Sequence, residues 1–210
     1  MTPELDKALC EKYPKIFADR NKNMMQSCMY WGLAIGDGWY NIIDIMCATI
    51  QGHIDWSVKS YNNSMKHNEM VITARNGDFT LFNKLHAKLT EPHKQEYLER
   101  ILGIAENEGQ DNYGYGIHRI DEVIPQLVAD QVKEKFAGLR FYHHGGDKFC
   151  DGIIQMAEGI SYRTCEECGA PGKVGGRGWI KTLCPAHIKP GEEAHFGEMT
   201  QEVDLEASDE

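Results

Sequence analysis

The sequence lacks the features that define several large protein classes. Its 210 residues contain no apolar run of about 18 residues, the length that a membrane-spanning helix needs. The start, MTPELDKALCEKYPK, has no apolar stretch behind a basic end, so we expect no secretory leader and no membrane association. The complete phosphate-binding loop, the dinucleotide fingerprint, HExxH, the nucleophile elbow and the protein-kinase motifs are all missing. These absences favour a protein that is not an enzyme.

A disulfide framework is also missing. The seven cysteines are odd in number and widely spaced, which argues against stable pairing in an oxidising compartment. Four of them, Cys10, Cys28, Cys47 and Cys150, lie among apolar neighbours. We expect these four to be small thiols that fill the core.

Positive charge is scarce at the C-terminal end. Residues 191–210, GEEAHFGEMTQEVDLEASDE, hold eight of the 32 acidic residues and no lysine or arginine, and the whole chain carries a net charge of −10. Such a segment cannot bury enough apolar surface to offset the entropy lost on ordering, so we predict a disordered acidic tail. It could keep the protein soluble, shield a basic patch or mimic nucleic acid.

The remaining sequence is rich in helical patterns. Apolar residues recur at helical spacing in TPELDKALCEKY, from Trp39 to Ile54, in residues 79–89 and 90–105, and in PQLVADQVKEKF (125–136). Thr2 and Asp37 are candidate N-caps, and Gly138 is a candidate left-handed cap. LRFYHH (139–144) reads as a short strand, with Leu139 and Phe141 facing one way. Gly145-Gly146 then makes a turn, Asp147 caps a last helix, and residues 107–118 read as a surface loop.

The predicted fold class is therefore α+β. We expect a helix-rich body with a short strand or small sheet over residues 1–160, a zinc-ribbon-like module over 161–190, and the tail over 191–210.

That module carries the most specific motif in the chain. Cys165, Cys168, Cys184 and His187 follow the spacing C-x2-C-x15-C-x2-H. Zinc is held by four such ligands in a tetrahedron, and a CxxC turn directs both sulfurs to one ion. Gly169 supplies the positive φ that such a turn often needs. We predict a structural Zn²⁺, because four protein ligands leave no position for a reactive water and three thiolates weaken the Lewis acidity of the metal.

Two alternatives are open for the segment between the ligand pairs, GAPGKVGGRGWIKTL. Lys173, Arg177 and Lys181 flank the aromatic Trp179, a combination suited to phosphate contact and base stacking. The negative charge of the chain argues against nucleic acid. In the simpler alternative the segment is a plain hairpin, with Trp179 and Leu183 packed on the body.

A second candidate centre is the histidine turn FYHHGGD. His143, His144 and Asp147, with His118 or Asp121, could form a metal-dependent or acid–base hydrolase site. Adjacent residues of a strand point to opposite faces, however, so both imidazoles cannot easily serve one site. A turn followed by a helix cap explains the same residues.

Together, several segments resemble a widespread group of phage and prophage proteins. They are KYPKIF, GDGWYNIID, QVKEKFAGLRFY, GGD, RTCEECGAPGK and GWIKTLC. The similar proteins carry KEKFGGLRFY, where this chain has Ala137 in place of the first glycine. The resemblance implies a setting, the cytoplasm of an infected bacterium, but no established activity.

The combined expectation is a phage-encoded, zinc-stabilised binding protein that acts on a host factor. It could bind a host protein or sequester a signalling nucleotide, and so counter host defence. Residues of the strand and of the hairpin are the expected ligand contacts: Arg140, Tyr142, Lys173, Arg177 and Trp179. The alternatives are nucleic-acid binding by the hairpin and hydrolysis at the histidine turn.

Overall fold

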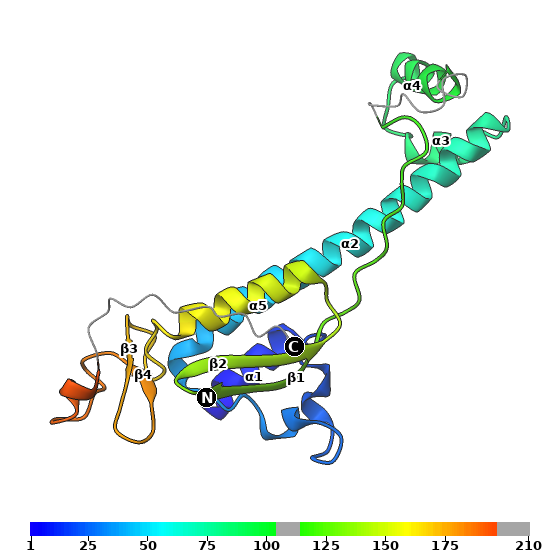
Figure 1. Cartoon of the computed structure of the whole chain (residues 1–210). Coiled ribbons are helices and arrows are strands. Elements are labelled where there is room, and N and C mark those ends of the chain that lie inside the picture. Colours follow the sequence, from blue (N-terminus) through cyan, green and yellow to red (C-terminus); the bar gives the residue numbers. More distant parts are fainter. Residues whose placement is uncertain (104–113, 197–210) are drawn as a thin grey trace. The chain divides into compact units, whose positions relative to one another are not determined.

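A computed structural model of the chain describes residues 1–103 and 114–196 (Figure 1). Its α-helices and strands are α1 (Pro3–Lys12), α2 (Tyr40–Arg75), α3 (Thr80–Leu85), α4 (Glu91–Gly103), β1 (Val128–Lys135), β2 (Gly138–His144), α5 (Lys148–Ser161), β3 (Lys173–Gly175) and β4 (Lys181–Leu183). The strands form two antiparallel hairpins, β1–β2 and β3–β4. The predicted class, a helix-rich α+β fold with a small C-terminal hairpin module, is confirmed.

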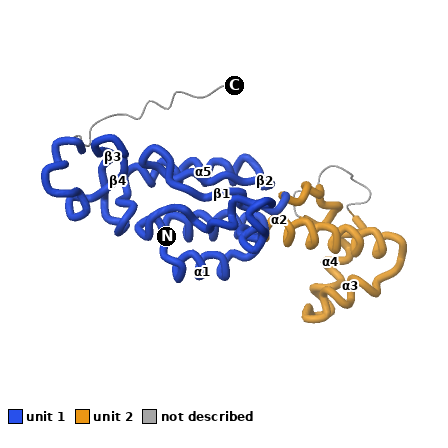
Figure 2. Tube along the Cα trace, turned by 90° about the horizontal axis from the view of Figure 1, so that it is seen from below, with its two compact units in different colours: residues 1–54, 125–210 blue, residues 55–124 orange. Residues whose placement is uncertain are grey.

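The chain divides into two compact units, coloured separately in Figure 2. The first contains residues 1–54 and the described part of 125–210, and the second contains residues 55–124. Residues 161–190 of the predicted zinc module belong to the first unit, together with α1, both hairpins and α5. Residues 107–113 of the predicted loop (107–118) and residues 197–210 of the predicted tail (191–210) lie outside the described residues.

The core of the first unit forms around the start of α2. Trp39, Ile43, Ile50 and Ile54 are buried, as their helical spacing predicts. Thr2 is the N-cap position of α1 and Pro3 its first residue, as predicted. The Asp37 carboxylate does not act as the predicted N-cap. It accepts a hydrogen bond from the Thr2 backbone N–H at 2.6 Å and so links the N-terminus to this segment.

The predicted helix over 125–136 is wrong, because these residues form strand β1, which pairs with β2. A β-bulge between Ala129 and Gln131 shifts the register. As a result Ala129 and Val132, three residues apart, are both buried, and the spacing mimics that of a helix. Gly138 accordingly caps no helix. A Cβ there would lie 2.3 Å from the ring of Tyr162, so glycine is needed for this close packing.

The β1–β2 turn has an unusual composition. Its two residues, Phe136 and Ala137, have φ angles of 53° and 66°. Positive φ at both positions defines a type I′ turn, which favours asparagine and glycine. Ala137 is held there by two hydrogen bonds: its N–H donates to Glu134 Oε1 at 2.7 Å, and its carbonyl accepts from Thr182 Oγ1 at 2.7 Å.

This turn yields a stability prediction. Phe136 is 66% exposed and packs little, so Phe136→Asn should relieve left-handed strain without loss of burial. We expect the free energy of unfolding to rise by about 1 kcal/mol, measured by urea denaturation. Lys135→Asn, one residue earlier in β1, is the matched control and should not stabilise the protein. Equal effects of both changes would contradict the assignment of strain to position 136.

The strand and helix that follow the turn match the predictions. Leu139 and Phe141 are buried on one face of β2, whereas Tyr142 on the other face is exposed. Asp147 caps α5 by accepting a hydrogen bond from the Cys150 N–H at 3.1 Å. In Figures 1 and 2, α5 lies beside the first half of α2, and the β1–β2 hairpin lies beside α5.

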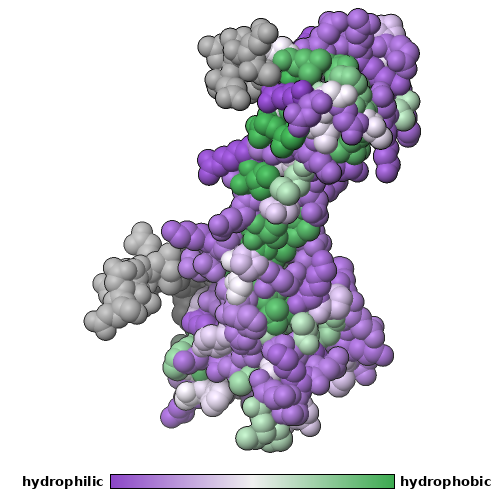
Figure 3. Space-filling model, turned by 90° about the vertical axis from the view of Figure 1, so that its right-hand side faces the viewer, coloured by the Kyte–Doolittle hydropathy of each residue, from purple (hydrophilic) through white to green (hydrophobic). Residues whose placement is uncertain are grey.

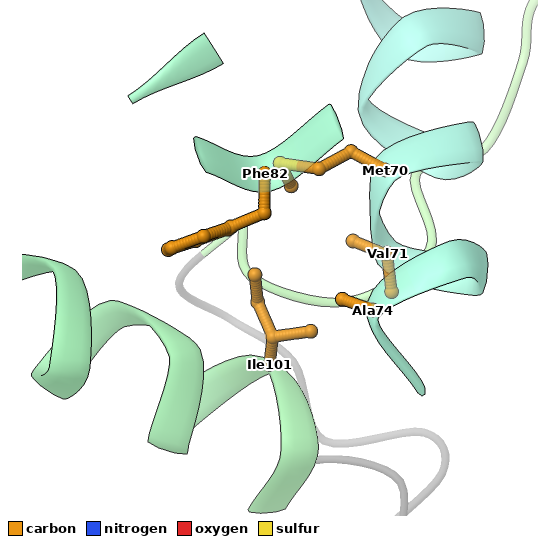
Figure 4. Close-up of a cluster of buried hydrophobic side chains, with 5 residues drawn as sticks. All are labelled: Met70, Val71, Ala74, Phe82 and Ile101. Atoms are coloured by element: carbon orange, nitrogen blue, oxygen red, sulfur yellow. The ribbon is translucent and has the colours of Figure 1, made fainter. Parts of the chain in front are cut away.

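The second unit has its own small core. Met70, Val71 and Ala74 of α2, Phe82 of α3 and Ile101 of α4 are buried together (Figure 4). The Asn68 side chain stabilises the returning segment, because it bonds both the N–H and the carbonyl of His118. The face drawn in Figure 3 is mainly hydrophilic, with hydrophobic side chains in separate groups between polar ones.

Candidate metal centre

The four predicted ligands converge on one point. The sulfur, or the ring nitrogen for His187, of Cys165, Cys168, Cys184 and His187 all lie within 4.8 Å of one another. The Cys168 and Cys184 sulfurs are 3.6 Å apart, and His187 Nδ1 lies 3.6 Å from Cys165 Sγ and 3.2 Å from Cys184 Sγ. A tetrahedral zinc ion would separate two sulfurs by about 3.8 Å and a sulfur from a nitrogen by about 3.5 Å. The cluster therefore fits one metal ion.

Local backbone bonds aim the ligands. Gly169 has a φ of 78°, and its N–H donates to the Cys165 carbonyl at 2.9 Å, which closes the first CxxC turn. In the second pair the Cys184 carbonyl accepts from the Ile188 N–H at 3.2 Å, the equivalent bond, and from the His187 N–H at 2.9 Å. Both pairs thus close a turn through the carbonyl of their first cysteine. Cys165 and Cys184 are buried, while Cys168 and His187 are exposed, so the ion would lie at the edge of the unit.

The other cysteines lie outside this cluster. Cys47 and Cys150 are buried as expected, and burial raises the pKa of the Cys150 thiol to about 11. Cys10 is half-buried, and burial together with the Asp6 carboxylate raises its pKa to about 12. The prediction that Cys28 fills the core is wrong, because Cys28 is exposed and its neighbour Met29 takes the buried position.

The first CxxC turn packs directly on the GDGW segment. The Gly38 N–H donates to the Glu166 carbonyl at 2.8 Å, and the Trp39 indole N–H donates to the Thr164 carbonyl at 2.8 Å. A Cβ on Gly38 would lie 2.2 Å from the Cys165 carbonyl oxygen and 2.4 Å from Gly169 N. Glycine at position 38 is thus required for contact with the metal turn.

Glu166 is a buried acid within this contact. Its Oε1 accepts a hydrogen bond from the Gly36 N–H at 3.1 Å, and Lys181 Nζ lies 3.6 Å from its Oε2. Burial raises the pKa of the Glu166 carboxyl, and the Lys181 ammonium opposes that shift. Sequence reasoning missed this residue. In the sequence, only its position between the two cysteines of a CxxC pair could have drawn attention to Glu166, because a side chain there faces either the body of the protein or water.

Two further contacts hold the β3–β4 hairpin. The buried Thr182 hydroxyl of β4 donates to the Ala137 carbonyl in the β1–β2 turn. On the other strand, Gly175 of β3 forms a bridge with Phe196, which is buried. Residues 191–196, the first part of the predicted tail, thus have defined structure and include a short 3-10 helix, Glu193–His195. The hairpin is anchored by the metal turns, the β1–β2 turn and this returning segment.

The connection between β3 and β4 projects from these anchors. Trp179 is 75% exposed, and Arg177 is exposed beside it. Among the described residues neither side chain has a hydrogen bond or ion pair, whereas Lys181 pairs with Glu167 at 3.2 Å. Lys173, at the start of β3, is half-buried. Of the two alternatives that the sequence left open, the packed Trp179 is wrong, and the tip is displayed to solvent.

The two candidate contact residues of β2 differ from each other. Arg140 donates to Tyr162 Oη at 2.6 Å and to the Leu139 carbonyl at 2.7 Å, and lies 3.8 Å from Glu158. Its guanidinium is therefore engaged inside the first unit. Tyr142 is exposed, with Lys133 Nζ 5.3 Å from its ring centroid.

The residues of the histidine turn have separate partners. His143 Nε2 lies 3.5 Å from Asp151, His144 Nδ1 lies 2.8 Å from Asp130, and His53 Nε2 lies 3.0 Å from Asp147. Partial burial alone would raise the pKa of Asp147, but the bonds from His53 and the Cys150 N–H hold it below its usual range. These described contacts do not bring His143, His144 and Asp147 onto one shared group.

The two residues considered as helpers of that turn belong to the second unit. The His118 ring stacks on His67 with centroids 3.9 Å apart, and His118 Nε2 lies 3.1 Å from the Gly114 carbonyl oxygen. Asp121 is exposed and pairs with Arg119 at 3.3 Å. Both have local roles within their own unit.

No protein-family model, curated protein or solved structure matches the chain. Within the described ranges, no helix combines the length and hydropathy that crossing a membrane requires. The interpretation of the site therefore rests on its own geometry, which shows a Cys3His cluster consistent with a zinc module.

Proposed function

We propose that this is a binding protein in which a structural zinc ion braces a displayed hairpin. The observation that carries the proposal is the 75% exposure of Trp179 at the tip of a hairpin with three separate anchors. A large aromatic side chain in water is unfavourable for folding alone, and such residues concentrate at the centres of binding sites. Four protein ligands around the ion support a structural metal, because the shell leaves no place for a substrate.

The residues of the tip indicate the chemistry of the partner. Trp179 offers a flat apolar face and Arg177 a positive charge, and the half-buried Lys173, which pairs with Leu183 at the base of the hairpin, adds a second positive charge. Together they suit a partner that presents an apolar or aromatic group next to an acidic one, such as a host protein surface or a signalling nucleotide. The similarity of GDGWYNIID and RTCEECGAPGK to phage proteins supports a host factor as the target, including one of host defence.

The proposal predicts that the tip binds without stabilising the fold. We expect Trp179→Ala and Arg177→Ala each to weaken partner binding at least about tenfold, equivalent to about 1.4 kcal/mol. The melting temperature and the zinc content should remain unchanged, because both side chains are exposed and neither has a hydrogen bond or ion pair within the described residues.

A comparative capture experiment would check this. The wild-type protein and the Trp179→Ala variant would be used as bait in lysate of phage-infected bacteria, with mass spectrometry of bound proteins and small molecules. Candidates would then be re-tested in purified form by calorimetry. Met25→Ala is the matched control, since Met25 is 88% exposed elsewhere in the first unit. If a purified partner bound the Trp179→Ala variant as tightly as the wild-type protein, the hairpin tip would not be its binding site.

Nucleic-acid binding by the same tip is the second candidate, favoured by the exposed pairing of Trp179 with Arg177. A single-stranded oligonucleotide could stack a base on Trp179 and place a phosphate on Arg177. Its affinity should then fall steeply with salt in a gel-shift titration. Absence of a shift at low salt, with and without residues 197–210, would eliminate this candidate.

A further inference from the structure

A second surface, remote from the hairpin tip in sequence, is built by α2 and α5. The two helices run antiparallel. At one end the ring of His53 packs on Phe149 with centroids 4.3 Å apart, and at the other the Trp39 indole N–H donates to the Thr164 carbonyl. Figures 1 and 2 show the two helices side by side within the first unit.

An apolar groove lies along the seam between these helices, with a cavity of about 430 Å³. Ile42, Ile45 and Met46 line it from α2, and Ile153, Met156 and Ile160 line it from α5. Ile45 is 64% exposed, Met156 54% and Ile160 45%. Large apolar side chains contiguous along two helices mark an interaction surface rather than scattered surface residues.

The surface around the groove carries little charge. Asp37 lines the groove, and its carboxylate accepts the hydrogen bond from the Thr2 N–H. Between Tyr40 and Ile54, α2 has one charged residue, Asp44, and the Lys12 ammonium is 2.7 Å from it. Between Gly152 and Ser161, α5 has only Glu158, which accepts a hydrogen bond from the Phe141 N–H at 2.9 Å. These three carboxylates, Asp37, Asp44 and Glu158, thus all have partners within the chain. In a chain with 26% charged residues and a net charge of −10, this face is poor in charge.

Three exposed glycines lie on the same two helices. A Cβ on Gly52 of α2, or on Gly152 or Gly159 of α5, would meet no atom within 4 Å. Glycine is the least favourable residue inside a helix apart from proline, so the packing of one chain gives no reason for these three. The three glycines are not among the residues that line the groove, but exposed glycines on the same helices would let the backbone of a facing helix approach closely.

We propose that this face binds a second copy of the same chain, so that α2 and α5 of each copy form a four-helix bundle about a twofold axis. Two chains of net charge −10 repel each other, and this face is where they can meet without bringing like charges together. An anionic membrane would find no basic residue in the groove lining, and a basic helix would find only Asp37, whose carboxylate already accepts a hydrogen bond from Thr2. The apolar residues of the same face on a second copy can cover the groove, and a twofold interface requires such a self-complementary surface.

The dimensions set the expected strength. The uncharged part of α2, from Tyr40 to Ile54, spans about 22 Å, and two adjacent helices cover a width of about 20 Å. The product is about 440 Å² per copy, or about 880 Å² in all, which is below the roughly 1,200 Å² of stable specific interfaces, so we expect weak, reversible dimerisation with a Kd of about ten micromolar or weaker.

Sedimentation equilibrium of the full-length, zinc-loaded chain would test this, over concentrations from well below to well above micromolar. Wild type should pass from monomer to dimer. Ile45→Glu and Met156→Glu should each raise the dimer Kd at least about tenfold. Each substitution places a carboxylate from both copies in the apolar interface, where the charges would be buried without partners. Met25→Glu adds the same charge at an exposed methionine outside the groove and should leave the Kd unchanged.

The glycines provide a test that does not depend on a destabilised variant. Gly152→Ala with Gly159→Ala should raise the melting temperature of dilute monomer, because both sites are open, and yet weaken dimerisation by blocking close approach. Gly103→Ala in α4, also open, is the control and should not alter the Kd.

Three results would overturn the proposal. Wild type could remain monomeric at every concentration. It could dimerise equally well with Ile45→Glu or with the paired glycine changes. It could also stay monomeric while binding an added fatty acid or apolar dye in an Ile45-dependent way, which would assign the groove to a small apolar ligand.

Discussion

Removal of the metal is expected to expose residues far from the metal ligands in sequence. Structural zinc in isolated fingers supplies about 10–16 kcal/mol of apparent binding free energy, more than a segment of this size can replace by packing. After chelation and dialysis, hydrogen exchange should accelerate across residues 161–190. It should also accelerate at Gly38 and Trp39, because the Gly38 N–H and the Trp39 indole bond carbonyls of the first metal turn.

Single-ligand variants give the same result without a chelator. Cys168→Ser should abolish stoichiometric zinc, measured by plasma mass spectrometry, and shift the emission of the buried Trp39 to longer wavelength. Cys28→Ser is a closely matched control, because Cys28 is also exposed but lies outside the cluster. The core around Phe82 and Ile101 contains no metal ligand and should keep its protection from exchange. Full protection of residues 161–190 in the metal-free protein would contradict a structural metal.

Gly38→Ala is expected to be among the most damaging single substitutions in the first unit. The new methyl group would lie 2.2 Å from the Cys165 carbonyl oxygen, and the obstructing atoms are backbone atoms that cannot rotate away. We expect a loss of about 3 kcal/mol in the free energy of unfolding, at the upper end of overpacking effects. Because the obstructed atoms belong to the metal turn, zinc affinity should fall as well.

Urea denaturation and competition with a zinc-binding dye would measure the two effects. Gly103→Ala, at the end of α4 and open to solvent, should change stability by less than about 1 kcal/mol and leave zinc affinity unaltered. A Gly38→Ala protein with wild-type stability and zinc affinity would show that the GDGW segment does not support the metal centre.

The metal ligands could be predicted from the sequence because their chemistry is local. A CxxC pair and a CxxH pair each close a turn within a few residues, so their spacing alone indicates convergence. The β1 strand could not be predicted in the same way. Its bulge places Ala129 and Val132 on one face three residues apart, and periodicity cannot distinguish that spacing from a helix.

Contacts between segments that are distant in the chain also could not be predicted from the sequence. Nothing in the sequence around Gly36 and Gly38 indicates what these glycines contact, and only the structure shows that Glu166 and Cys165 occupy the space a side chain would need. Likewise Arg140 looks like a ligand contact on a strand, but the Tyr162 hydroxyl, twenty-two residues later, already accepts its hydrogen bond. Both cases depend on pairings that neighbouring residues do not encode.

The anchoring of the β3–β4 hairpin has a consequence for how its specificity can change. The residues that fix the hairpin, Thr182, Gly175 and the four metal ligands, are separate from the tip residues Arg177 and Trp179. Substitutions of Arg177 and Trp179 should therefore alter recognition while leaving folding intact, whereas Gly176 and Gly178, with φ angles of 125° and 85°, should be retained. The side chains at the tip can therefore vary, in evolution or by design, without changing the residues that fold the hairpin.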